Sequence, residues 1–144
     1  MPTVTEALAS GKTRQRVDAL ALAKIIREMD PDTIVLERVG PRPGQGSVSS
    51  WALCRAATLC EGISAALGIT LLQPRPQVWR ATVGLPKGLK KAAGKTASRK
   101  LAATLFPDHA DLFRLVKHDG NAEAVLIGLY GAEKTPNITY DKRN

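Results

Sequence analysis

The alternation of two short apolar segments with one long helix most restricts the folds open to this chain. Residues 33–39 are β-branched and almost continuously apolar, which is typical of a strand covered on both faces. A helix rich in small residues is predicted over 51–67, and a second short strand over 69–72. Strands that alternate with helices indicate the α/β class.

Further helices are predicted on either side of this unit. One begins after Asp18, a residue type suited to an N-cap, and ends at Asp30-Pro31. Others are predicted over 96–105, 108–116 and 119–130, the last closed by Gly131. Residues 1–16 show no usable period, 40–50 and 84–95 are expected to be loops, Pro74 and Pro76 to open a turn, and 132–144 to form a disordered tail.

The composition fits one folded domain, which we place at residues 1–131. The chain has 144 residues, of which 44% are hydrophobic. It contains no run of eighteen apolar residues and opens with no charged segment followed by an apolar one. We therefore expect neither a membrane span nor a secretion signal.

Cys54 and Cys60 are six residues apart on one predicted helix, and we interpret them as two buried thiols in a reducing compartment.

The positive charge is concentrated in one part of the chain. There are 21 Lys and Arg against 13 Asp and Glu, a net charge of +8. Residues 62–107 contain no acid at all, yet they carry Arg75, Arg80, Lys87, Lys90, Lys91, Lys95, Arg99 and Lys100. Because a solvated surface usually mixes signs, this segment indicates a polyanion partner such as nucleic acid.

Three acidic residues are the candidates for chemistry. Glu37 interrupts the end of an apolar strand, where a carboxylate is costly unless it is paired or binds a cation. Asp119 and Glu123 are four residues apart at the start of the last helix and share one face. The alternatives are an edge-strand side chain leaning into water for Glu37, and a simple N-cap for Asp119.

Three converging carboxylates would form an oxygen-only site suited to Mg²⁺ or Mn²⁺. With phosphate as substrate, the matching chemistry is metal-assisted phosphodiester hydrolysis. The phosphate contacts are expected among the cations of the acid-free segment, namely Arg80, Lys87, Lys90, Lys91, Lys95, Arg99 and Lys100. Trp79 would either stack on a base or fill the core, and the core is the commoner place for such a residue. No GxSxG motif and no P-loop is present.

The order of several motifs resembles a known family. These are VLERV with Glu37, PGQG at 43–46, a small-residue helix with Gly62, Pro76-x-x-Trp79-Arg80, Lys95-x-x-Ser98, Phe106-Pro107 and DGNAEAVLIGLYG from Asp119. Over residues 1–131 the chain resembles the phage and bacterial RuvC-like Holliday junction resolvases of the RNase H-like superfamily.

The resemblance implies a dimeric, Mg²⁺-dependent endonuclease that cuts branched DNA in recombination and repair. It also implies a cytoplasmic protein encoded by a bacterium or a phage. Glu37 matches the family's strand glutamate, and Asp119 and Glu123 match its final-helix acids. Two positions depart from the usual pattern. The last acid is Glu123 where many members have Asp, and Trp79-Arg80 stands where Trp-Lys is usual.

One departure concerns the start of the chain. Members of the family begin with a strand ending in Asp-Pro-Gly, whose Asp is a central metal ligand. This chain begins at Met1-Pro2-Thr3, similar to the tail of the hairpin that follows that strand. The expected fold is therefore an RNase H-like mixed sheet, flanked by helices and lacking its first strand. Either the start was assigned too far downstream or the product is truncated.

The sequence is compatible with three functions. The first is a structure-selective endonuclease whose junction cleavage needs Mg²⁺ and is abolished by Glu37→Gln. The second is a non-catalytic DNA-binding remnant of the same fold, which would bind junctions in a salt-sensitive manner without cutting them. The third is a basic RNA-binding protein, suggested by the net charge alone, which would not prefer four-way DNA over duplex RNA.

Overall fold

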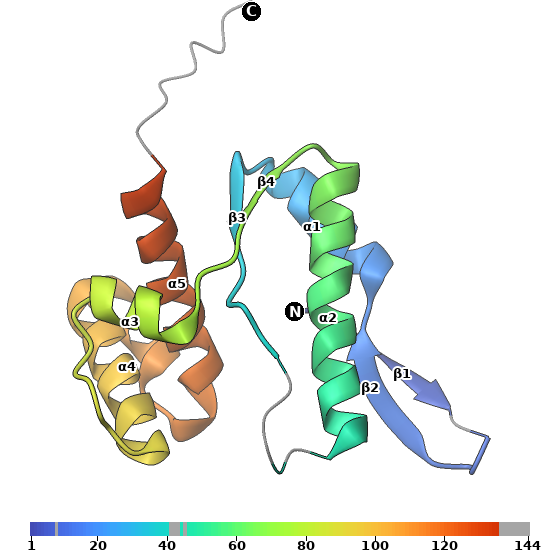
Figure 1. The fold of residues 1–144 in the computed structure, drawn as a ribbon, viewed down its shortest axis with the longest axis horizontal. Helices are drawn as coiled ribbons and strands as arrows, with labels where there is room; N and C mark the ends of the chain where they lie inside the picture. The colour runs from blue at the N-terminus through green and yellow to red at the C-terminus, as the bar shows by residue number, and fades with distance from the viewer. Residues whose placement is uncertain (8, 41–43, 45, 136–144) are drawn as a thin grey trace, which may run out of the picture. The chain divides into compact units, whose positions relative to one another are not determined.

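The computed structural model describes residues 1–7, 9–40, 44 and 46–135. It has the mixed α/β composition that the alternating pattern predicts, with helices and two small sheets (Figure 1). Its contacts fall into two compact units, Met1–Leu72 and Gln73–Asn144. The single domain over residues 1–131 stays a prediction. All the strands of the described residues belong to the first unit.

The first unit opens with a β-hairpin that the local sequence pattern did not predict, although the family resemblance places the tail of a hairpin region there. Strands β1 (Thr3–Ala7) and β2 (Thr13–Val17) pair antiparallel, with Thr3 opposite Val17 and Ala7 opposite Thr13. Four of the five residues of β1 are exposed. A hairpin with so little burial needs no apolar alternation, and this explains why residues 1–16 carry no period.

Helix α1 (Ala19–Met29) confirms the predicted start and stop signals. The Asp18 side chain caps its first turn by accepting a hydrogen bond from the Ala21 amide at 3.0 Å. Asp30 ends the helix in the left-handed region at φ 44°, a conformation that a short polar side chain tolerates better than a branched one. Pro31 follows and cannot continue the helical hydrogen bonds.

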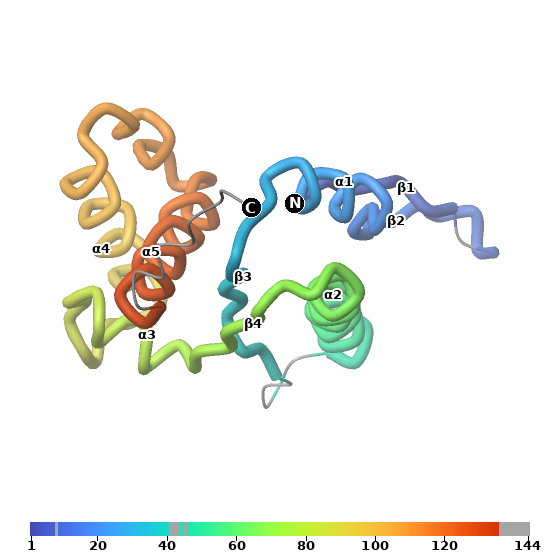
Figure 2. The backbone as a smooth tube through the Cα atoms, turned by 90° about the horizontal axis from the view of Figure 1, so that it is seen from above, coloured from blue at the N-terminus to red at the C-terminus, as the bar shows by residue number. Residues whose placement is uncertain are grey.

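A strand–helix–strand unit completes the first half of the chain. Strands β3 (Thr33–Val35) and β4 (Thr70–Leu72) run parallel and are joined through helix α2 (Ser47–Ala66). The two strands lie side by side in both views (Figures 1 and 2). The Leu36 amide still donates to the Leu72 carbonyl at 2.9 Å. The ladder is shorter than the predicted 33–39 because β4 ends just before Pro74, which has no amide hydrogen.

Helix α2 begins earlier than predicted, at Ser47 instead of Trp51. Its N-cap is Gly46, so Ser47, Ser49 and Ser50 of the predicted loop lie inside the helix. Residues 41–43 and 45 of the predicted loop lie outside the described part. Both cysteines are free, as expected, but Cys54 is exposed and only Cys60 is buried, which corrects the prediction of two buried thiols. Burial raises the pKa of the Cys60 thiol.

The second unit is helical. It contains α3 (Pro76–Thr82), α4 (Lys91–Leu105), the 3₁₀ turns η1 (Pro107–Phe113) and η2 (Val116–His118), and α5 (Asp119–Lys134). Helix α3 replaces the predicted turn, α4 begins five residues before the predicted 96, and the two 3₁₀ turns replace the predicted helix over 108–116. Helix α5 runs through Gly131, so it includes residues 132–134 of the predicted tail. Residues 136–144 of that tail lie outside the described part.

The core of the second unit forms where α3, α4, α5 and η1 meet. Its buried members are Trp79, Leu85, Ala102, Phe113, Ala122 and Leu126. Trp79 has no exposed surface, so the core interpretation holds and base stacking by this residue is wrong. Among the described residues, no helix is both long and apolar enough to cross a lipid bilayer.

Because α4 is closely packed at Ala102, a larger side chain there should destabilise the second unit. This residue is fully buried in the core of the second unit. We expect Ala102→Leu to lower the free energy of unfolding by about 1–3 kcal/mol, because added methyl groups force neighbours out of their preferred rotamers. Ala93→Leu makes the same change at an exposed position of the same helix. Urea unfolding in which both variants lose equal stability would contradict the packing described.

Candidate functional site

Asp119, the first residue of α5, receives two cations from α4. Its Oδ2 accepts a hydrogen bond from Lys95 Nζ at 2.8 Å, and its Oδ1 lies 3.0 Å from Arg99 Nε. Lys95 and Arg99 are four residues apart, so they lie on one face of α4. Helices α4 and α5 pack side by side in both views (Figures 1 and 2). This basic face of α4 therefore meets a carboxylate of its own chain.

Glu123, one turn further along α5, receives a third cation. Arg80 Nη2 of α3 donates to Glu123 Oε1 at 2.7 Å. The Arg80 guanidinium also lies over the Trp79 ring, 5.2 Å from its centroid. A Cβ added at Gly94 would lie 3.6 Å from Arg80 Nη1, an ordinary van der Waals distance, so α4 passes beside the guanidinium at this residue.

These five side chains, Arg80, Lys95, Arg99, Asp119 and Glu123, are called the α5 carboxylate cluster below. It contains three cations and two acids, so its formal charge is positive. The Asp119 carboxylate, through its hydrogen bond and its charge, raises the pKa of Lys95. Lys95 therefore stays charged across the physiological pH range.

Hydrogen bonding within the cluster is incomplete. Among the described residues, Arg80 Nε, Arg99 Nε and Asp119 Oδ1 are buried atoms without an aligned hydrogen bond. Arg99 Nε and Asp119 Oδ1 attract each other as an ion pair, but their geometry does not form a hydrogen bond. Buried polar atoms of this kind are costly, and a ligand that supplied the missing contacts would lower that cost.

The donor chemistry of the cluster suits a divalent cation in part. Asp119 and Glu123 supply carboxylate oxygens one helical turn apart, and hard cations such as Mg²⁺ prefer such ligands. The unbonded Oδ1 of Asp119 has capacity for a further contact. Within the described residues no group of three or more His, Cys, Asp or Glu side chains gathers as a metal site. Asp119 and Glu123 therefore fit two of the carboxylate positions around a divalent cation.

Glu37, the third predicted acid, belongs to the first unit. It follows β3 and is half-buried, and it is not without an interaction partner. The sequence placed Glu37 at the end of a strand over 33–39, whereas β3 ends at Val35 and Glu37 lies beyond it. Its convergence with Asp119 and Glu123 stays a prediction.

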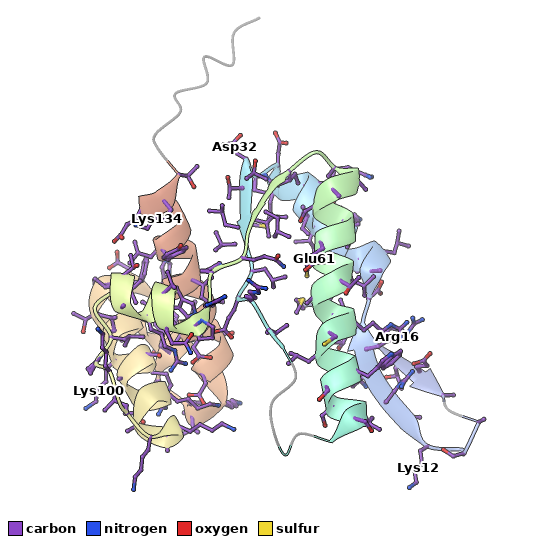
Figure 3. The ribbon with its side chains drawn as sticks, in the orientation of Figure 1. Lys12, Arg16, Asp32, Glu61, Lys100 and Lys134 are labelled. Carbon is purple, nitrogen blue, oxygen red and sulfur yellow. The ribbon has the colours of Figure 1, made fainter. Side chains whose placement is uncertain are left out.

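The predicted phosphate contacts fall into two groups. Arg80, Lys95 and Arg99 are bound to the two acids of α5. The other four are exposed around α4 and the loop before it, and they are Lys87, Lys90, Lys91 and Lys100, the last labelled in Figure 3. The four exposed lysines are more available to a polyanion than the three cations that are paired with acids.

Two hollows adjoin these residues in the second unit. One, of about 440 Å³, is lined by Lys91, Lys95, Thr96, Arg99, Val116 and Asp119. The other, of about 390 Å³, lies between α3 and the start of α4 and includes Arg80 and Lys87 among mainly apolar residues. The first hollow places three cations and one carboxylate around a single opening.

Sequence reasoning missed the contacts between the predicted residues. The i, i+4 spacings of Lys95 with Arg99 and of Asp119 with Glu123 were both visible in the sequence. The opposite charges of the two pairs are the signal that could have predicted a contact between them. A basic helix face can be neutralised by an acidic helix face of the same spacing. The sequence places Gly94 in a basic loop, and its position beside Arg80 follows only from the helix packing.

Comparison with known proteins gives one informative similarity. No protein-family profile matches the chain. Over 88 residues, which is 61% of the chain, it is 30% identical to the chloroplastic Holliday junction resolvase MOC1 of Chlamydomonas reinhardtii. The matched region is only 10% of that protein's length. The chain is thus similar, at a distance, to a part of a junction resolvase.

Proposed function

We propose that this chain is a structure-selective DNA endonuclease that resolves Holliday junctions by metal-dependent phosphodiester hydrolysis. The observation that carries the proposal is the α5 carboxylate cluster, in which two acids lie among three cations beside a basic hollow. The distant similarity to a junction resolvase supports branched DNA as the substrate.

Asp119 and Glu123 would hold Mg²⁺ or Mn²⁺, with Glu37 as the third carboxylate of the proposal. When bound, such an ion activates water and stabilises the leaving oxygen of a phosphodiester. The protein's own residues have a separate task. Lys95 and Arg99 lie within reach of the same carboxylate and would neutralise the phosphate that approaches it.

The exposed lysines would extend this contact along the DNA backbone. Lys87, Lys90, Lys91 and Lys100 make no ion pair within the described residues. Each phosphate neutralised by such a side chain releases counterions, so binding should weaken as salt rises. These phosphate contacts contribute to the affinity for DNA but do not distinguish one base sequence from another.

Among junction resolvases, we propose that this chain belongs to the RuvC-like branch and has an RNase H-like fold. We further propose a homodimer, because α2 carries small side chains that allow close helix approach, and a cytoplasmic location in a bacterium or a phage-infected cell. The order of motifs from Glu37 to the final helix supports this assignment.

One observation favours the non-catalytic alternative. Both acids of the cluster already have cationic partners, so the chain neutralises them without any metal. Under this alternative the cluster stabilises the contacts of α3, α4 and α5, and the exposed lysines bind junctions without cutting them.

Cleavage of a synthetic four-way DNA junction tests the proposal. The full chain should nick end-labelled junction strands in Mg²⁺ or Mn²⁺ and should be inactive in EDTA. A linear duplex of the same sequence should stay uncut. Junction binding without cleavage in either metal would refute the nuclease and support the non-catalytic remnant. Equal affinity for duplex RNA and four-way DNA would refute both and leave a general basic RNA-binding protein.

A further inference from the structure

A second group of cations lies in the first unit, where the hairpin meets α2. Arg14 and Arg16 come from β2, and Arg55 and Trp51 come from the first half of α2. Together with Glu6 of β1 these residues are called the hairpin arginine cluster below. The three arginines and Trp51 border a hollow of about 170 Å³ between β2 and α2. Arg16 is labelled in Figure 3.

Trp51 organises two of the three guanidiniums. The Cζ atoms of Arg14 and Arg55 each lie 5.1 Å from the centroid of its ring. A cation–π contact uses the flat face of the guanidinium and leaves the N–H groups at its rim available. Trp51 is itself 52% exposed, so the platform that it forms with the arginines reaches solvent.

The acids nearby are too few to neutralise the cluster. Glu6 Oε2 accepts a hydrogen bond from Arg14 Nε at 2.7 Å. This bond chiefly lowers the pKa of Glu6, and the charges of Arg16 and Arg55 lower it further. One carboxylate therefore serves three arginines. Within the described residues Arg16 and Arg55 have no ion pair.

We propose that the hairpin arginine cluster binds the sugar–phosphate backbone of DNA, as a contact surface separate from the α5 carboxylate cluster. Arginine supplies all three cations, and its planar fork matches phosphate oxygens in a bidentate manner. The excess positive charge favours an anionic partner, and a duplex arm presents phosphates at regular spacing. The choice of DNA as the polyanion rests on the proposed function; the site itself rests on the first unit alone.

The salt dependence of junction binding tests this surface. Anisotropy of a fluorescent four-way junction is measured in EDTA, so that no cleavage occurs, with the full chain and with Arg16→Ala/Arg55→Ala. We expect the slope of log K against log salt to fall by about 1.8, which is two phosphate contacts at about 0.9 each. Affinity at a fixed low salt concentration should fall roughly tenfold.

A matched variant separates local contact from net charge. Lys24→Ala/Arg27→Ala removes two exposed cations of α1 in the same unit and should leave the slope unchanged. Arg16→Lys/Arg55→Lys, which keeps the charge, should restore most of the slope. Far-UV circular dichroism checks that each variant is folded. Equal slopes for the Arg16/Arg55 and Lys24/Arg27 alanine pairs would overturn the proposal.

Two further outcomes distinguish this proposal from others. If the chain cuts no junction but the Arg16/Arg55 effect holds, the nuclease fails and the second DNA surface stands. If the alanine pair abolishes binding to phosphatidylserine vesicles and leaves DNA binding unchanged, the cluster is a membrane contact and the proposal is wrong.

Discussion

Trp79→Ala should lower the free energy of unfolding of the second unit by about 3–5 kcal/mol. The Trp79 side chain is fully buried, and it is the largest member of the core formed with Leu85, Phe113, Ala122 and Leu126. Removing the indole loses its transfer free energy and leaves a cavity that α3, α4 and α5 cannot fill without moving apart. Urea unfolding followed by circular dichroism measures the loss.

Val78→Ala is the matched control because Val78 is the preceding residue of the same helix and is 47% exposed. It should change the free energy of unfolding by no more than about 0.5 kcal/mol. If Trp79→Ala cost as little as Val78→Ala, the core of the second unit would not be built around this indole.

Asp119→Asn should separate cleavage from binding. The amide keeps the shape of the side chain but removes the charge of a proposed metal ligand, so junction cleavage should fall by about 100-fold or more. Junction affinity in EDTA should rise, because Lys95 and Arg99 then lose the carboxylate that neutralises them. Labelled-junction cleavage assays and anisotropy titrations measure the two effects.

Asp111→Asn serves as the control for this pair of measurements. The Asp111 side chain is 97% exposed and pairs only loosely with Arg114, at 3.8 Å. Neither cleavage nor affinity should change. Undiminished cleavage by Asp119→Asn would remove Asp119 from the proposed metal site, and lower affinity would show that its ion pairs hold the DNA-binding surface in shape.

The parts of the fold with strong local signals could be predicted from the sequence. Asp18 is a good N-cap followed by apolar residues at helical spacing, and both features appear at the start of α1. The parallel pairing of β3 and β4 follows from two apolar segments joined by a helix. The hairpin was missed because its strands are mostly exposed, and an exposed strand shows no apolar period.

The start of α4 was missed for a different reason. Gly84, Gly88 and Gly94 make this segment look like a loop, since glycine disfavours a helix interior. In the structure Gly94 is a buried residue of α4 that lies beside Arg80. The start of α4 therefore depends on tertiary packing, which no single segment of the sequence reveals.

The candidate site was predictable in composition but not in its contacts. Sequence spacing placed Lys95 with Arg99 and Asp119 with Glu123, and the structure confirms that the members of each pair lie close in space. That the two pairs meet depends on how α4 packs against α5. Packing of this kind is set by core residues such as Ala102 and Ala122, whose apolar character does not specify the partner.

The two tryptophans of the chain are distributed one to each unit. Trp51 is 52% exposed in the first unit, and Trp79 is fully shielded in the second. A shielded indole emits at shorter wavelengths than a solvated one, so loss of structure around Trp79 shifts its emission to the red, whereas Trp51 starts nearer the red limit. Steady-state emission spectra of the unaltered chain therefore contain two separable optical reporters, and heating experiments can follow the melting of the helical half without an added dye.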